Sequence, residues 1–240
     1  MRALIVLLSA ALLSGCQMQQ EKPTSAQIEV IGMKARQEAD AHAERKLMRW
    51  AEQDMPVAQR ELALVYQARP KQRADALKLF ELAARGGDTE AAFQLGEMLR
   101  VGAPGVAAAP AAAAPWYTIA AKQQHARAAL ALGLQYKNGD GVRRDDAAAA
   151  RWLSHASELG NAHAMFLLSN IYNEGIGVVQ DRARARQWLE EAAEHEYPPA
   201  LQELAMTVQL GDALTPKDEL RASHLMKDAT EHRRNNWNRF

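Results

Sequence analysis

The chain has 240 residues, with 29 Lys and Arg against 29 Asp and Glu, and a single cysteine. This balance gives no electrostatic case for binding nucleic acid, which needs a basic surface, and one cysteine excludes a disulfide within the chain. No stretch alternates valine or isoleucine with polar residues, so the pattern indicates an all-α protein that folds as one elongated domain.

Residues 1–15 have the pattern of an export signal. Arg2 is followed by an apolar run from Ala3 to Leu13, about half the length needed to span a bilayer. The run leads into Leu13-Ser14-Gly15-Cys16, which resembles the lipobox of a bacterial lipoprotein. The resemblance implies cleavage before Cys16 and acylation of this residue, and two or three acyl chains anchor a protein stably because each buried methylene adds about 0.8 kcal/mol. An ordinary secretory signal or an accidental apolar start is the alternative.

The residue after the cysteine indicates the membrane in which the protein is anchored. Gln17 stands where an Asp is the usual inner-membrane retention signal of Gram-negative lipoproteins. We therefore expect a lipid anchor in the outer membrane and a chain that faces the periplasm, with display on the cell surface as the alternative. Removal of Arg2 with the signal leaves 28 Lys and Arg against 29 acidic residues, so the mature chain stays close to neutral.

Two short segments follow the cysteine. Residues 16–26 are polar and lack apolar periodicity, which predicts a flexible tether that holds the domain within roughly 20 Å of the membrane. Residues 27–55 return to a helical pattern, in which Leu47, Trp50 and Ala51 occupy core positions. We expect residues 27–55 to form an N-terminal capping helix.

From residue 56 onward the sequence repeats with a period close to 36 residues. Trp116, Trp152 and Trp188 stand at this spacing, and a fixed period of this length predicts stacked structural units. We expect these tryptophans to be buried beside small alanines. Each unit contains a small residue followed four positions later by Leu: Ala58/Leu62, Ala91/Leu95, Ala128/Leu132, Ala164/Leu168 and Ala200/Leu204.

Each unit is predicted to consist of two helices. In the third unit, Ala128, Leu132 and Tyr136 share one helical face. Gly139 is suited to end this helix because glycine readily adopts the left-handed conformation beyond a helix C-terminus. Asp145 or the neighbouring Asp146 is placed to cap the second helix.

The pattern A-x3-L-[GAS]-x2-Y-x2-G-x-G-V-x2-D-x6-W-L-x2-A resembles the Sel-one-like repeat, a relative of the tetratricopeptide repeat. Residues 126–161 and 162–197 match it closely, whereas the fifth unit has Val208 in place of Tyr and His224 in place of Trp. Degenerate terminal units are expected because each lacks one neighbour. The resemblance implies a right-handed α-solenoid of about five helix-turn-helix repeats over residues 56–234.

Two segments have open interpretations. Ala103 to Pro115 is rich in Ala and Pro; we expect a shortened second helix that begins near Pro115, with a docking strap as the alternative. The end of the chain, including the tail 235–240, is basic and aromatic. It is suited either to contact lipid headgroups or a partner, or to fold back over the exposed end of the fifth unit.

The sequence gives little support for catalysis, and no cofactor is expected. Gly139-x-Gly141 follows a predicted helix and lacks a third glycine, which argues against a phosphate-binding loop. His155, Glu158, His163 and His195 are candidates to meet between the third and fourth units, but their spacing matches no common metal motif. We therefore expect no metal site, no enzymatic activity and no small-molecule substrate.

The remaining functional surface is the groove that such stacks present, lined in tetratricopeptide-like proteins by the first helix of each unit. Apolar anchors flanked by charged and amide groups suit an extended peptide or a helix of another protein. For Phe93, Leu130 and Phe166 the alternative is simply a place in the core, whereas Arg100, Lys137 and Asn173 are expected to be exposed. By register, the predicted groove consists of Arg60, Phe93, Glu97, Arg100, Arg127, Leu130, Leu134, Lys137, His163, Phe166, Asn170, Asn173, Gln202, Met206 and Gln209, with Leu64 beside Arg60.

These features together predict a lipid-anchored, non-enzymatic scaffold whose partners are other proteins of the bacterial envelope. The scaffold is expected to assist assembly or regulation of an envelope complex, such as a secretion or polysaccharide-export system. The first alternative is a peptidoglycan- or muropeptide-binding module, or a regulator of cell-wall hydrolases, which would need exposed Trp or Tyr in the groove. The second is a hydrolase, for which only the region of His155 and His163 offers candidate residues.

Overall fold

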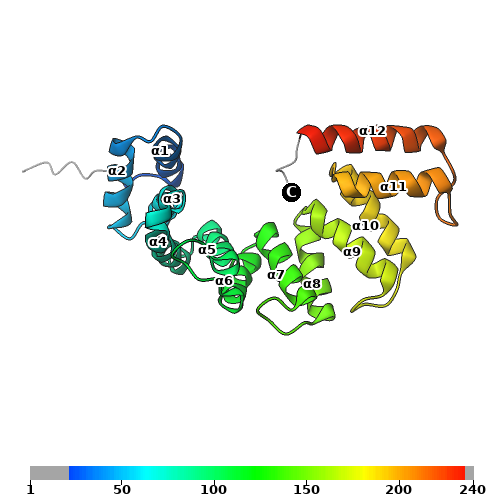
Figure 1. The fold of residues 1–240 in the computed structure, drawn as a ribbon, viewed down its shortest axis with the longest axis horizontal. Helices are drawn as coiled ribbons and strands as arrows, with labels where there is room; N and C mark the ends of the chain where they lie inside the picture. The colour runs from blue at the N-terminus through cyan, green and yellow to red at the C-terminus, as the bar shows by residue number, and fades with distance from the viewer. Residues whose placement is uncertain (1–21, 236–240) are drawn as a thin grey trace, which may run out of the picture.

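The computed structural model describes residues 22–235, which form twelve α-helices and one short 3-10 helix and contain no strand. Successive helix pairs follow one another along a curved array (Figure 1), so the predicted all-α solenoid is confirmed. Residues 1–21, with the predicted signal and Cys16, and residues 236–240 of the tail lie outside the described part. The helices are α1 (Ser25–Gln37), α2 (Ala41–Ala51), α3 (Pro56–Gln67), η1 (Pro70–Gln72), α4 (Arg73–Arg85), α5 (Thr89–Val101), α6 (Pro110–Lys122), α7 (Ala126–Asn138), α8 (Asp146–Glu158), α9 (Ala162–Glu174), α10 (Arg182–Glu194), α11 (Pro198–Leu210) and α12 (Glu219–Asn235).

The N-terminal cap is a pair of helices, so the prediction of a single capping helix over 27–55 is wrong. Ala39 has a positive φ of 50° and turns the chain between α1 and α2, and Asp40 caps α2 through hydrogen bonds to two backbone amides. Helix α1 also begins at Ser25, inside the predicted tether. Its start is a capping box of Thr24 and Gln27, a sequence signal that explains why the helix forms so early.

The five predicted repeats correspond to the pairs α3/α4, α5/α6, α7/α8, α9/α10 and α11/α12, and the two helices of each pair pack on one another. In the third pair, Ala128, Leu132 and Leu153 are fully buried. Gly133 explains the close approach of α7 and α8, because a Cβ at this position would lie 2.8 Å from the Leu153 side chain. The predicted cap of α8 is Asp145, which accepts a hydrogen bond from the Ala148 backbone amide.

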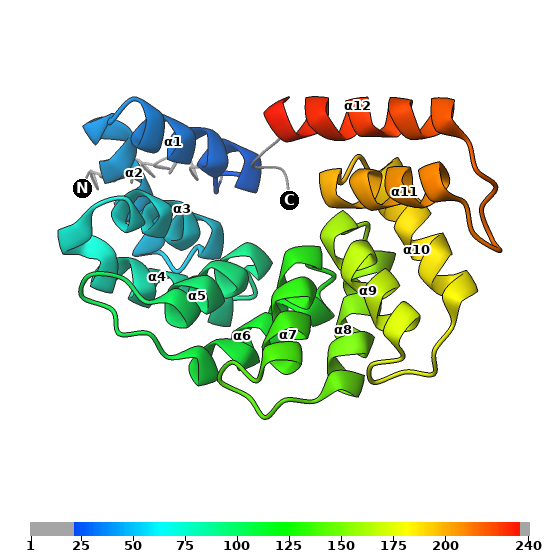
Figure 2. The same ribbon diagram turned by 45° about the vertical axis from the view of Figure 1, so that its right-hand side comes forward.

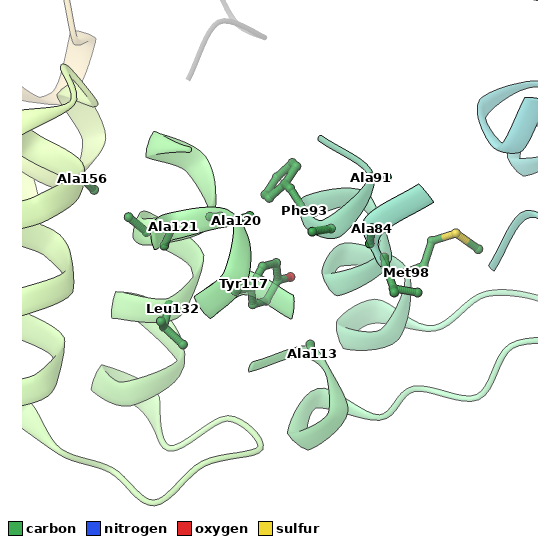
Figure 3. Close-up of a cluster of buried hydrophobic side chains, with 14 of the residues drawn as sticks. Ala84, Ala91, Phe93, Met98, Ala113, Tyr117, Ala120, Ala121, Leu132 and Ala156 are labelled. Carbon is green, nitrogen blue, oxygen red and sulfur yellow. The ribbon is translucent and has the colours of Figure 1, made fainter. Parts of the chain in front are cut away.

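The expected burial of the repeat tryptophans is wrong in degree. Trp116, Trp152 and Trp188 are only half-buried and pack against the edge of the core. The next residue along the helix takes the innermost place, as Tyr117 and Leu153 show with no exposed surface. Figure 3 shows the Tyr117 ring pointing into the cluster between α5 and α7.

In the loops of the third and fourth units, the second glycine explains how neighbouring units fit together. Gly141 has a φ of +72°, and a Cβ on it would lie 2.3 Å from backbone atoms of Pro110 and Ala111 at the start of α6. Gly177 meets the start of α8 in the same way, with a Cβ 2.4 Å from the backbone of Asp146. These two loops therefore dock the third unit on the second and the fourth unit on the third, and only glycine leaves room for that approach.

The Ala/Pro-rich loop differs from its prediction as well. Helix α6 begins at Pro110 and has 13 residues, so it is neither shortened nor started near Pro115, which lies inside it. Proline is favoured in the first turn of a helix because the amide it lacks has no partner there. The loop itself is closed by two backbone hydrogen bonds between Ala103 and Val106, of 2.8 and 2.7 Å.

Candidate functional site

A hollow of about 290 Å³ lies between α5, α7 and the start of α9. It is the part of the predicted groove that the structure brings together. Helices α5 and α7 occupy the middle of the curved array in Figure 2. The predicted residues that line this hollow, here called the groove, are Phe93, Glu97, Arg100, Arg127, Leu130, Leu134 and His163.

The floor of the groove is aromatic. Phe93 is only 3% exposed, so it belongs to the core and also lines the groove. The His125 ring stacks on the Phe93 ring at a centroid distance of 4.6 Å. The Arg127 guanidinium makes a cation–π contact with the same ring and lies 4.6 Å from its centroid. Arg127 itself is exposed and, among the described residues, takes part in no ion pair, which leaves a cation at the groove surface.

One wall of the groove carries an internally neutralised carboxylate. Glu97 is paired with Arg100 at 2.9 Å and accepts a hydrogen bond from the Tyr117 hydroxyl. Burial alone would raise the pKa of Glu97, but the hydrogen bonds from Arg100 and Tyr117 outweigh it and lower the pKa. Burial, followed by the hydrogen bond to Glu97, raises the pKa of Tyr117. Arg100 is therefore half-buried in this cluster, against the expectation that it would be exposed.

The other end of the groove has a second aromatic stack. The His163 ring lies 5.4 Å from the Tyr197 ring and nearly parallel to it, and Phe166 packs on the same tyrosine at 5.5 Å. Burial, and then the charge of Lys137, lower the pKa of His163. An uncharged imidazole at neutral pH follows, since an ordinary histidine has a pKa of about 6.5. Between the two stacks, Leu130 is half-buried rather than part of the fully buried core.

The rest of the predicted groove is divided among separate surfaces. Lys137, half-buried rather than exposed, and Asn170 line an adjacent hollow of about 170 Å³, and Asn170 and the exposed Asn173 line another of about 200 Å³ beyond it. Met206 and Gln209 are exposed on α11, where the groove does not reach. The Gln202 amide accepts a hydrogen bond from Arg233 of α12 at 2.8 Å, so the last helix folds back onto this position.

Arg60 does not belong to the groove surface. Its side chain is 12% exposed and pairs with Glu29 at 2.7 Å, Glu61 at 3.0 Å and Asp88 at 2.9 Å. Arg36 pairs with the same Glu61. This network joins α1, α3 and the start of α5, which makes Arg60 a structural residue that fastens the N-terminal helix pair to the first repeat.

Sequence reasoning missed a set of residues in and beside the groove that occupy the N-cap position of the first helix in three units; two of them, His125 and Asn161, cap the helix through a side-chain hydrogen bond. His125, Asn161 and Tyr197 stand immediately before α7, α9 and α11, at intervals of 36 residues. His125 and Asn161 line the groove or its floor, and Tyr197 supports His163. Their spacing was visible in the sequence, but the variety of residue types concealed the shared position.

The candidate metal and catalytic residues do not converge. His155 hydrogen bonds to the Ala121 carbonyl at 3.1 Å and lies 3.9 Å from Glu158, whereas His163 stacks on Tyr197. Within residues 22–235, no three His, Cys, Asp or Glu side chains gather closely enough to hold a metal ion. None of the helices in the same range has the length and hydropathy to cross a bilayer.

The family of the chain follows from its repeats. The Sel1 repeat family model matches residues 56–88, 89–125, 126–161 and 162–197, the same units that the helix pairs α3/α4 to α9/α10 occupy. The chain belongs to the Sel1 repeat family. Proteins of this family are scaffolds for protein–protein interaction, and no significant match was found among curated proteins.

Solved structures share the fold. A protective antigen of uropathogenic Escherichia coli strains with an SLR fold is 26% identical, with a TM-score of 0.75 over 87% of this chain and 46% of the antigen. A Sel1 repeat protein from Oxalobacter formigenes is 25% identical, with a TM-score of 0.70 over 86% of this chain and 85% of that protein. An immunity protein from Pseudomonas aeruginosa, 18% identical with a TM-score of 0.50 over 88% of this chain and 83% of its own, supports the fold alone. This Sel1 repeat protein thus spans about half of the length of the E. coli antigen.

Proposed function

We propose that this Sel1 repeat protein is a lipid-anchored, non-enzymatic scaffold of the bacterial envelope, which holds an extended segment of another envelope protein in the groove between α5, α7 and α9. The family provides the interaction role. The pattern of residues 1–16 supports the anchor, and Gln17 supports an outer-membrane location facing the periplasm.

The observation that carries the proposal is the combination of exposed groups in the groove. Leu130 and Leu134 offer half-buried apolar surface, which suits an apolar side chain of the partner. Arg127 offers a cation held over an aromatic ring, whereas Glu97 is already neutralised by Arg100. We therefore expect the bound segment to place an apolar residue near a carboxylate, since the apolar contact gives affinity and the charge gives orientation.

The experiment is photo-crosslinking in intact cells with a reactive residue at Leu134 or Arg127 in the groove. The control position is Arg151, an exposed residue of α8 outside the groove. We expect one recurrent envelope protein to be captured from both groove positions and not from Arg151. Capture of glycan alone, or equal capture from all three positions, would refute the proposal and favour cell-wall binding or non-specific contact.

A further inference from the structure

A larger hollow, of about 720 Å³, lies at the N-terminal end between α1 and α2, away from the groove. Val30 and Ile31 of α1 form one side, and Lys46, Arg49 and Trp50 of α2 form the other. The Val30 side chain is 46% exposed, although it stands on a helix whose other face is part of the core. This hollow, here called the N-terminal pocket, therefore combines apolar surface with cations and an aromatic ring.

The charge of the N-terminal pocket is uncompensated. Its lining contains no carboxylate, and within residues 22–235 neither Lys46 nor Arg49 forms an ion pair. Other cations of the same region are neutralised, since Arg36 pairs with Glu61 and Arg69 pairs with Glu44. The Lys46 ammonium instead lies 5.1 Å from the Trp50 ring centroid. Two cations without an ion-pair partner, beside apolar surface, favour an anionic ligand that also has an apolar part.

The position of the pocket indicates which ligand is at hand. Pro23 lines the pocket, so only residues 17–22 separate it from Cys16. Six residues reach at most about 20 Å when fully extended. With Cys16 acylated, which is the anchor that the proposed function includes, the pocket is held at the surface of the membrane.

We propose that the N-terminal pocket binds the phosphate headgroup of an anionic phospholipid. Lys46 and Arg49 contact the phosphate through charge-assisted hydrogen bonds, and Trp50 lies at the depth of the headgroups, where tryptophan is enriched in membrane proteins. Val30 extends the apolar surface toward the acyl region. This contact orients the solenoid relative to the membrane, which acyl chains on Cys16 alone do not do.

The test measures binding to vesicles by the mature chain from residue 16 with Cys16→Ser, so that no acyl chain contributes. Vesicles of phosphatidylcholine are compared with vesicles that also contain phosphatidylglycerol. We expect binding only to the second, and we expect Lys46→Gln with Arg49→Gln to weaken it roughly 25-fold, because each cation near an anionic surface contributes about 1 kcal/mol. The matched control removes two exposed cations elsewhere, Lys122→Gln with Arg151→Gln, and we expect it to change binding less than about 3-fold.

Circular dichroism of both variants checks that the fold is intact. The proposal is wrong if the chain binds neither vesicle, or if the two double variants bind phosphatidylglycerol vesicles equally. Groove crosslinking from Leu134 is independent of this outcome, because Leu134 lies outside the N-terminal pocket. A failure of the lipid site therefore leaves the scaffold proposal standing, and a failure of groove capture leaves the lipid site testable.

Discussion

Two glycines of one loop give a matched test of how the repeats dock. Gly139 and Gly141 both have a positive φ, of +73° and +72°. A Cβ on Gly139 would have its nearest neighbour at 3.5 Å, whereas a Cβ on Gly141 would lie 2.3 Å from backbone atoms of α6. Substitution by alanine therefore places a side chain at a strained positive φ in both positions, and creates a backbone clash at only one.

We expect Gly139→Ala to lower the free energy of unfolding by about 1 kcal/mol, the cost of a left-handed alanine. We expect Gly141→Ala to lower it by about 3 kcal/mol, because forcing atoms into a packed contact adds about 1–3 kcal/mol. Urea denaturation followed by circular dichroism measures both, compared at equal slopes with urea concentration. Equal losses for the two variants would refute the conclusion that the second glycine docks the unit on the preceding one.

Three further predictions follow from the ion pairs and pKa shifts. Arg60→Met removes the partner of two buried carboxylates, so we expect urea denaturation to show a loss of about 3 kcal/mol; a loss below about 0.5 kcal/mol would place Arg60 among ordinary surface residues. Glu97 has a lowered pKa, so its contribution to stability is present above the pKa of an unfolded Glu and is lost as the pH falls through the folded pKa. Tyr117→Phe removes the hydrogen bond that the Tyr117 hydroxyl donates to Glu97, so it should raise the pKa of Glu97 in an NMR titration. An unchanged pKa would contradict the role assigned to the hydroxyl. His163 also has a lowered pKa, so its contribution to stability is complete above the pKa of an unfolded histidine and is lost as the pH falls through the pKa of His163 in the folded protein. Lys137→Met should raise the pKa of His163 part of the way toward that of a free imidazole. A fall in this pKa would contradict the repulsion assigned to Lys137 and His163.

The repeat architecture could be predicted because its signals are local and recur. Three signals depend only on near neighbours in the chain: the glycines that end the first helix of a unit, the aspartate that caps the second, and the helical spacing of Ala and Leu. Asp145 and Gly139 accordingly occupy the predicted positions. The same reasoning missed the capping box of Thr24 and Gln27, which was equally local and would have placed the start of α1 correctly.

The groove could be predicted only in part, because its surface depends on contacts between units. Register placed Arg60 beside the groove residues, but the N-terminal helix pair supplies Glu29 and withdraws that arginine into an ion-pair network. Register likewise placed Gln202 on an open surface, where Arg233 of α12 reaches it. The stacking of His125 on Phe93 joins the turn before α7 to helix α5, and no pattern within a single helix indicates it.

The expected burial of the tryptophans failed for a related reason. Trp152 and Leu153 are adjacent on α8, and only one of two consecutive residues can take the innermost position of a helix. Leu153 occupies it with no exposed surface, and Trp152 covers the edge of the core. None of the repeat tryptophans lines the groove between α5, α7 and α9, so a glycan-binding platform built on them is not located there.

The central claim is that the groove, and not the outer helices, holds a partner segment. The most direct test is calorimetric titration of the segment captured by crosslinking, as a synthetic peptide, into the wild type, Leu134→Asp and Leu82→Asp. Leu82 is an exposed leucine on α4 and serves as the matched control. The account predicts that Leu134→Asp weakens binding at least about 10-fold and that Leu82→Asp leaves it unchanged; equal affinities for all three proteins would contradict it.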